Sequence, residues 1–160
     1  MPTDDRILRD HLLELLRGGS AHADTSTSLK NFPEALFGKK PEGSPHTAWQ
    51  LLEHLRITQH DILDFCTNSA YLAPEWPEGY WPKTDAPEST EAWNASIKAF
   101  HADLKELEKL VQDESGNLYA KIPWGDGQTI LREVLLIADH NSYHLGQFVL
   151  LRKELGAWEA

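Results

Sequence analysis

Two histidines four residues apart, His140 and His144, are the residues in this chain best placed to do chemistry together. They lie in the segment Asp-His-Asn-Ser-Tyr-His-Leu-Gly-Gln, inside a stretch that reads as a long helix. Because residues four apart share one helix face, both imidazoles can reach a single divalent metal ion. His54, in a second amphipathic segment, is the candidate third ligand. Three histidine ligands would leave one coordination position open, as in a reactive rather than a structural metal site.

The pair also has a simpler interpretation, because two helical histidines at this spacing often occur by chance. The flanking sequence favours the metal. Apolar residues 135–137 and 148–151 surround the pair, and two unpartnered imidazoles on a buried face would be costly. The motif is not that of the zincin metalloproteases, in which glutamate follows the first histidine. This chain has Asn141 there, so a metalloprotease is disfavoured.

Two carboxylates lie on the same helix faces as the candidate ligands. At about 100° per residue, Glu133 falls two turns before His140, and Asp61 falls two turns after His54. Either carboxylate could orient a ligating histidine by accepting its second N–H. Either could instead act as a general base on water activated by the metal. The alternative is that both carboxylates only face solvent on the helix surface or form ion pairs with the neighbouring Arg132 and Arg56.

Three aromatic or loop residues are candidates for the walls of a ligand pocket. Trp76 and Trp81 lie in the proline-rich segment 73–82, and His22 lies in the loop Gly-Gly-Ser-Ala-His-Ala. The alternative is that the tryptophans only pack the loop against the core. The single cysteine, Cys66, is expected to be a packing residue; it excludes an intramolecular disulfide and fits a reducing, cytoplasmic location.

Four long helices must position these residues. Apolar periodicity and capping residues predict helices over about 4–17, 45–67, 90–112 and 130–155. A short helix within 25–37 and a small hairpin within 117–128 are also expected. Four helices of this length predict an all-α four-helix bundle, with residues 1–160 forming one domain.

Composition restricts the partners of this chain. The 160 residues carry 15 Lys+Arg against 25 Asp+Glu, a formal net charge of −10. The basic residues are scattered, whereas nucleic acids and anionic membranes require a basic patch. The sequence contains neither an apolar run of the roughly 18 residues that span a bilayer nor a secretory signal at its start. We therefore expect no nucleic-acid partner and no membrane association.

With these segments assembled, the chain resembles the DinB-like superfamily of metal-binding four-helix bundles. The resemblance is carried by residues 49–55 and 139–147, and also by residues 75–82 and 125–129. It implies an up-down-down-up bundle with a long crossover between the second and third helices. It also implies that His54, His140 and His144 bind a divalent metal such as zinc or nickel. Many members look dimeric, so a homodimer is expected by analogy.

The same resemblance implies an enzyme that acts on a small-molecule substrate, of one of two types. Some relatives transfer low-molecular-weight thiols such as bacillithiol or mycothiol, and others are described as metal-dependent hydrolases. Such thiols carry carboxylates, so a docking site should offer basic residues, for which Lys39, Lys40 and Lys83 in loops are candidates. The alternative to an enzyme is a non-catalytic, metal-stabilised module that binds a small molecule or a protein partner.

Overall fold

The computed structural model describes residues 3–158, and all regular elements in that range are helical. The first and last residues of the predicted domain lie outside the described residues. The helices are α1 (Thr3–Arg17), α2 (Thr25–Leu29), α3 (Ala48–Thr67), α4 (Thr90–Gln112) and α5 (Ile130–Glu154), with 3-10 turns η1 (Glu34–Leu36) and η2 (Glu78–Tyr80). Instead of the expected hairpin, residues 117–128 contribute only to an isolated bridge between Lys121 and Thr129.

Side-chain caps determine where the long helices begin. Ser89 and Thr129 accept the N–H groups of Ala92 and Arg132, so α4 and α5 start where the sequence predicts. Helix α3 starts at Ala48, three residues later than predicted from Pro45. Thr47 and Gln50 form a reciprocal capping box there, and this stronger signal sets the boundary.

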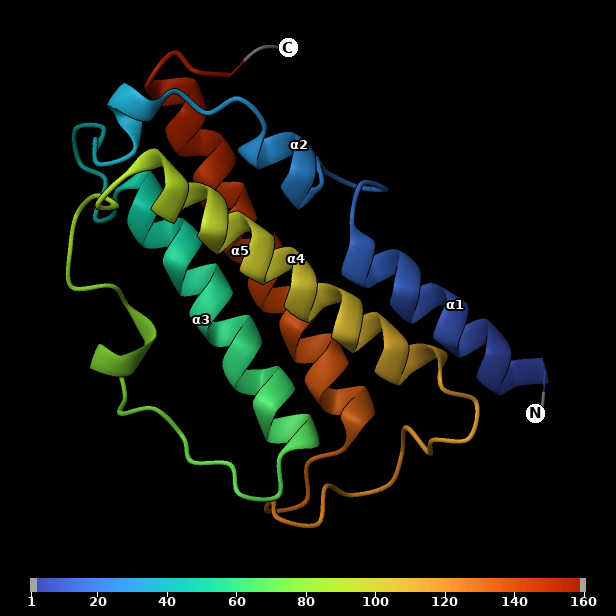
Figure 1. The fold of residues 1–160 in the computed structure, drawn as a ribbon. Coiled ribbons are helices and arrows are strands. Elements are labelled where there is room, and N and C mark those ends of the chain that lie inside the picture. Colours follow the sequence, from blue (N-terminus) through green and yellow to red (C-terminus); the bar gives the residue numbers. More distant parts are fainter. Residues whose placement is uncertain (1–2, 159–160) are drawn as a thin grey trace.

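The four long helices form the predicted up-down-down-up bundle. Figure 1 shows α1 and α5 running in one direction and α3 and α4 in the other. Helix α3 packs against both α4 and α5, and α1 covers the opposite side of the same two helices. Because α3 and α4 are parallel, residues 68–89 must cross the length of the bundle to connect them, as the green segment in Figure 1 does.

The bundle has two hydrophobic clusters, one at each end. The first joins α1 to the end of α3 and the start of α5, and includes Leu12, Ile62 and Ile137. The second joins α2 and the segment around η1 to the other end of the bundle, where Trp93 of α4 stacks on Phe37 with ring centroids 4.1 Å apart. Both clusters bring α3 against α5, which positions the candidate histidines.

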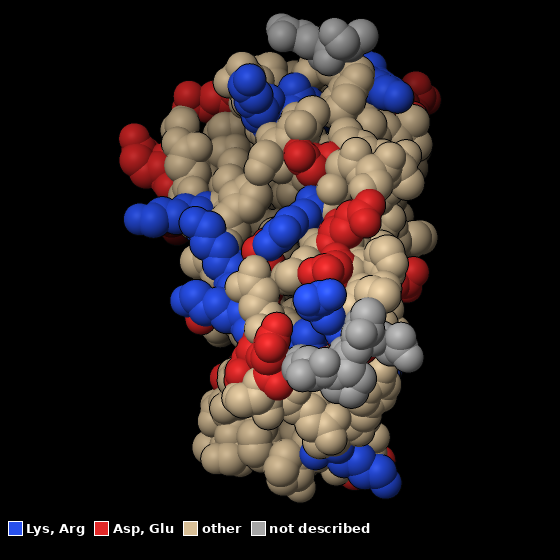
Figure 2. Space-filling view, turned by 90° about the vertical axis from the view of Figure 1, so that its right-hand side faces the viewer, with Lys and Arg blue, Asp and Glu red and all other residues tan. Residues whose placement is uncertain are grey.

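The surface shows no separation of charge on the face drawn in Figure 2, where basic side chains lie among acidic ones. None of the helices in residues 3–158 combines the length and the hydropathy that a membrane span requires.

Candidate metal centre

Helices α3 and α5 bring the three predicted histidines into contact. Nε2 of His54 lies 3.1 Å from Nε2 of His140 and 3.1 Å from Nε2 of His144. One ring nitrogen from each histidine lies within 4.8 Å of the others. Among the described residues, this is the one group of His, Cys, Asp or Glu side chains with the geometry to hold a metal ion. His54 is only 5% exposed, and His140 and His144 are partly buried.

Hydrogen bonds fix the proton positions on two of the rings. Nδ1 of His54 lies 2.8 Å from the carbonyl oxygen of Tyr80, and Nδ1 of His144 lies 2.8 Å from Oε1 of Gln147. Both oxygens can only accept, so each Nδ1 carries a proton and donates it. In a neutral imidazole the other nitrogen, Nε2, is then a bare lone pair. The lone pairs of His54 and His144 therefore face each other across 3.1 Å with no proton between them.

This arrangement fits a divalent cation. Zinc–imidazole bonds of about 2.0–2.1 Å with tetrahedral angles place neighbouring nitrogens roughly 3.3–3.4 Å apart. The two separations of 3.1 Å from His54 are slightly shorter than that spacing, so a small outward shift of the rings would admit the ion. The third ring differs from its neighbours, because Nδ1 of His140 is buried without a hydrogen-bond partner.

Burial keeps the three rings neutral. Together with the neighbouring imidazoles, it lowers the pKa of His54 and of His140 to about 4 each. Burial also lowers the pKa of His144, although the hydrogen bond to Gln147 opposes this. Neutral imidazole is the form that binds a metal. The environment of the site therefore favours the ligand form of all three histidines at neutral pH.

Trp81 stacks directly on His54. Its ring is parallel to that of His54, with centroids 3.9 Å apart and an interplanar angle of 2°. His46 stacks on Trp81 as well, with centroids 4.0 Å apart. Two imidazoles at these distances cannot both stack on the same face of the indole, so Trp81 lies between His46 and His54. Trp76 is 74% exposed, and the described aromatic contact of its ring is with Tyr80.

Asp61 lies at the base of the crossover instead of beside His54. Its carboxylate accepts hydrogen bonds from the hydroxyls of Tyr71, at 2.7 Å, and Tyr80, at 2.9 Å. Burial and the carboxylate raise the pKa of Tyr80 to about 12, so its hydroxyl stays protonated and donates. Because the carbonyl of Tyr80 accepts the Nδ1 proton of His54, Asp61 is linked to His54 through Tyr80.

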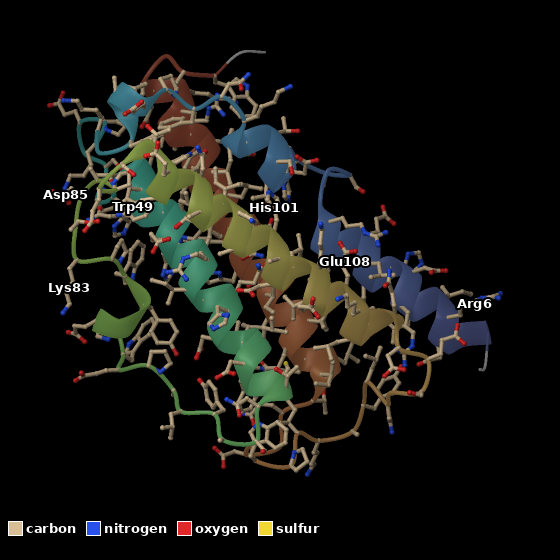
Figure 3. All side chains as sticks on the ribbon, viewed as in Figure 1. Arg6, Trp49, Lys83, Asp85, His101 and Glu108 are labelled. Carbon is tan, nitrogen blue, oxygen red and sulfur yellow. The ribbon has the colours of Figure 1, made fainter. Side chains whose placement is uncertain are left out.

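The far end of the crossover is also tied to α3. The carbonyl of Asp85 accepts a hydrogen bond from Thr47 Oγ1, and its carboxylate accepts one from Gln50 Nε2. Trp49 donates to Thr84 Oγ1 at 3.2 Å. Figure 3 shows Trp49 and Asp85 together at this end of α3, with Lys83 extending away from the helices. The crossover is thus held at both ends, and this holds Tyr80 and Trp81 over His54.

The other two predicted site residues lie elsewhere. Glu133 is 2% exposed and pairs with Arg132 Nη1 at 2.8 Å. Burial of Cys66, and to a lesser extent the charge of Glu133, raises the pKa of the Cys66 thiol to about 12, which leaves that thiol protonated and unreactive. His22 places its Nε2 3.0 Å from Ser142 Oγ, on the face of α5 opposite to His140 and His144.

Sequence reasoning missed two contacts of the site. Gln147 lies three residues after His144, and this spacing permits the hydrogen bond that it forms with His144 Nδ1. The carbonyl of Tyr80 had no sequence signal at all, because any residue type supplies a backbone carbonyl.

Fold and site together define an α-helical bundle with an internal three-histidine cluster suited to a divalent metal. A sequence profile described as the DinB superfamily matches residues 9–148, which include all three histidines. The chain therefore belongs to the DinB superfamily. Comparison with curated proteins and with solved structures found no match.

Proposed function

We propose that this protein is a metal-dependent enzyme in which His54, His140 and His144 hold one divalent ion, zinc or nickel. One observation carries the proposal: the Nε2 lone pairs of His54 and His144 face each other at 3.1 Å while both Nδ1 protons are committed to acceptors. Without a cation, this contact would be repulsive. Membership of a metal-linked superfamily supports the same conclusion.

An open coordination position makes the site reactive. The metal-compatible cluster in the described residues contains three histidines and no fourth ligand, whereas a structural zinc usually has four protein ligands. A divalent ion in such a site lowers the pKa of bound water to about 7 or deprotonates a bound thiol. This supports an enzyme over the non-catalytic alternative, a metal-stabilised binding module.

The protein's own side chains orient and shield the ligands. The Tyr80 carbonyl and the Gln147 amide hold the Nδ1 protons of His54 and His144, and so direct both Nε2 atoms to one point. Trp81 covers one face of His54 and excludes water there. Asp61, with two tyrosine hydroxyls on its carboxylate, is less available as a general base than the sequence suggested.

Two reaction types remain within the proposal, hydrolysis of a small-molecule substrate and transfer of a low-molecular-weight thiol. Lys40 supports the second type, because its charge acts on His46, which lies beside the three histidines. Burial lowers the pKa of His46 most, and the charges of His144 and Lys40 lower it as well. A carboxylate of such a thiol could pair with this lysine. Lys83 extends away from the bundle and is a weaker docking candidate (Figure 3).

Calorimetric titration of zinc into metal-free protein tests the ligand set. We expect one site per chain in the unaltered protein and none in His144→Ala. The matched control is His60→Ala on α3, because His60 is a surface residue paired with Asp103. Equal zinc binding by His144→Ala and the unaltered protein would remove His144 from the site.

Assays of the metal-loaded protein then test the reaction type. Cleavage of activated esters without a thiol would support hydrolysis, and conjugation of an electrophile only when thiol is present would support transfer. Metal binding with neither activity would favour the binding module. Light scattering in solution tests the expected homodimer.

A further inference from the structure

A cavity of about 330 Å³ adjoins the metal centre and has no assigned role. It lies between the loop that precedes α3 and the last two turns of α5. This volume is at the lower end of the range of about 300–1,000 Å³ that is usual for small-molecule pockets. The cavity therefore suits a small ligand.

Two of the cavity's lining residues also contact the metal centre. Gln147, which accepts the Nδ1 proton of His144, lines the cavity. His46 lines it too, and the stack of His46 on Trp81 and Trp81 on His54 continues to the ligands. A molecule in the cavity would therefore lie against the groups that position two of the three histidines.

The wall of the cavity is aliphatic. Leu51 from α3 and Leu151 from α5 are buried behind it, and Leu150, 56% exposed, lies at its edge. Such a wall takes a hydrocarbon chain, because burying apolar surface there removes it from water. None of these leucines can make the hydrogen bonds that a polar substrate would need.

The charged residues of the lining are both acidic. Glu42 and Glu154 line the cavity and are exposed at its rim, and the lining contains neither Lys nor Arg. Glu154 lies seven residues beyond Gln147 on α5, which is about 10 Å along the helix. The cavity thus has a metal-facing end at Gln147 and a carboxylate end at Glu154. Lys40, which acts on His46, is not part of the lining.

We propose that this cavity is the subsite for one arm of the substrate, a short aliphatic chain that ends in an ammonium group. The ammonium pairs with Glu42 and Glu154, the chain lies on the leucines, and the opposite end of the molecule reaches the histidines past Gln147. The proposal rests on the metal-dependent function above, and it names a substrate class for that same site.

Matched ligands of one chain length test the charge preference. Hexylamine, hexanol and hexanoate are titrated into the protein as isolated, and binding is followed by calorimetry. We expect hexylamine to bind about fivefold more tightly than hexanol, the effect of a partly exposed ion pair, and hexanoate to bind more weakly than both. Hexanoate binding as tightly as hexylamine would overturn the proposal.

Variants locate the binding site. Glu42→Gln with Glu154→Gln should reduce hexylamine affinity to that of hexanol. Glu114→Gln, an exposed position two residues beyond the end of α4 and outside the cavity lining, should have no effect. Leu150→Gln should weaken both hexylamine and hexanol. Leu135→Gln is its control, because Leu135 is also exposed on α5, at 46%. An amine preference that survives the double glutamate substitution would also overturn the proposal.

Metal content, measured on the same samples, separates the two proposals. If zinc binding depends on His144 but the protein shows no amine preference, the subsite alone is wrong. If the amine preference holds and no metal binds, the metal-dependent function is wrong and the assignment of the cavity to a substrate arm falls with it.

Discussion

Buried polar groups on the two sides of α3 differ in whether the protein supplies their hydrogen-bond partners. Toward α4, Glu53 accepts hydrogen bonds from Arg56 Nε at 2.7 Å and Nη2 at 2.8 Å, and from Ser96 Oγ. Gln59, fully buried, donates to the carbonyl of Phe100 at 2.7 Å. These groups are partnered within the protein. Toward α5, His54 and His144 present lone pairs to one another, and Nδ1 of His140 is left without a partner.

The difference shows which polar groups are structural and which point to a ligand. Buried polar groups are nearly always hydrogen-bonded, because leaving one unpaired costs about 1–3 kcal/mol. Helix α3 meets this requirement with protein partners on one side. On the other side Asn141 donates to Gln59 Oε1, but the Nε2 lone pairs of His54 and His144 face each other and need a cation between them. A divalent cation satisfies three Nε2 lone pairs at once.

The largest expected effect is on the α4 side. Glu53→Ala leaves Arg56 and Ser96 without their acceptor, and breaking a buried ion pair in this way should lower the free energy of unfolding by about 3 kcal/mol. Chemical denaturation measures this loss. Zinc binding by the folded fraction should be unchanged, and a parallel loss of zinc would show that the two sides of α3 are not independent.

Gln147→Met tests the support of the metal centre. It keeps the length of the side chain but removes the acceptor for His144 Nδ1, so the ring is free to turn. Loss of such a partner typically weakens metal binding by about 10- to 100-fold. Zinc affinity is measured by competition with a chelator. Unaltered affinity would mean that packing alone orients His144.

His140→Leu should have opposite effects on the two forms of the protein. It removes a metal ligand, so zinc binding should be lost. It also removes a buried nitrogen that lacks a partner, so the metal-free protein should unfold with a free energy about 1 kcal/mol higher. Denaturation in the presence of a chelator checks the second effect. A destabilised metal-free variant would place His140 with the structural polar groups of the α4 side.

The smallest expected effect concerns the crossover. Tyr80→Phe removes the hydroxyl that bonds Asp61 but keeps the carbonyl that orients His54, so zinc affinity should fall by less than about tenfold. Tyr71→Phe is the matched control, because it removes the other hydroxyl on Asp61 and leaves Tyr80 in place. If Tyr71→Phe weakened zinc binding as much, Asp61 would not act through Tyr80.

Much of the fold could be predicted from local sequence. The caps Ser89 and Thr129 mark the starts of α4 and α5 within the described chain. Apolar periodicity indicates four amphipathic helices, each of which must bury its apolar face against the others. The start of α3 was predicted three residues early, because Pro45 is a common first-turn residue and the Thr47–Gln50 box was not considered.

The site was only partly predictable, for a physical reason. The spacing of His140 and His144 places both on one helix face, so local geometry is enough to group them. The surroundings depend on residues 68–89, which follow no helical or strand period. The path of that crossover places two tyrosine hydroxyls on the Asp61 carboxylate and stacks Trp81 on His54. It also leaves Trp76 exposed. No spacing rule gives these contacts.

The most direct test of the account is the metal content of tag-free protein that has never been exposed to a nickel column, measured by mass spectrometry. The lone-pair geometry of His54 and His144 predicts about one zinc or nickel ion per chain, lost in His144→Ala and kept in His60→Ala. Protein with no divalent metal, and none taken up on reconstitution, would contradict the account and make the histidines packing residues of the α3–α5 interface.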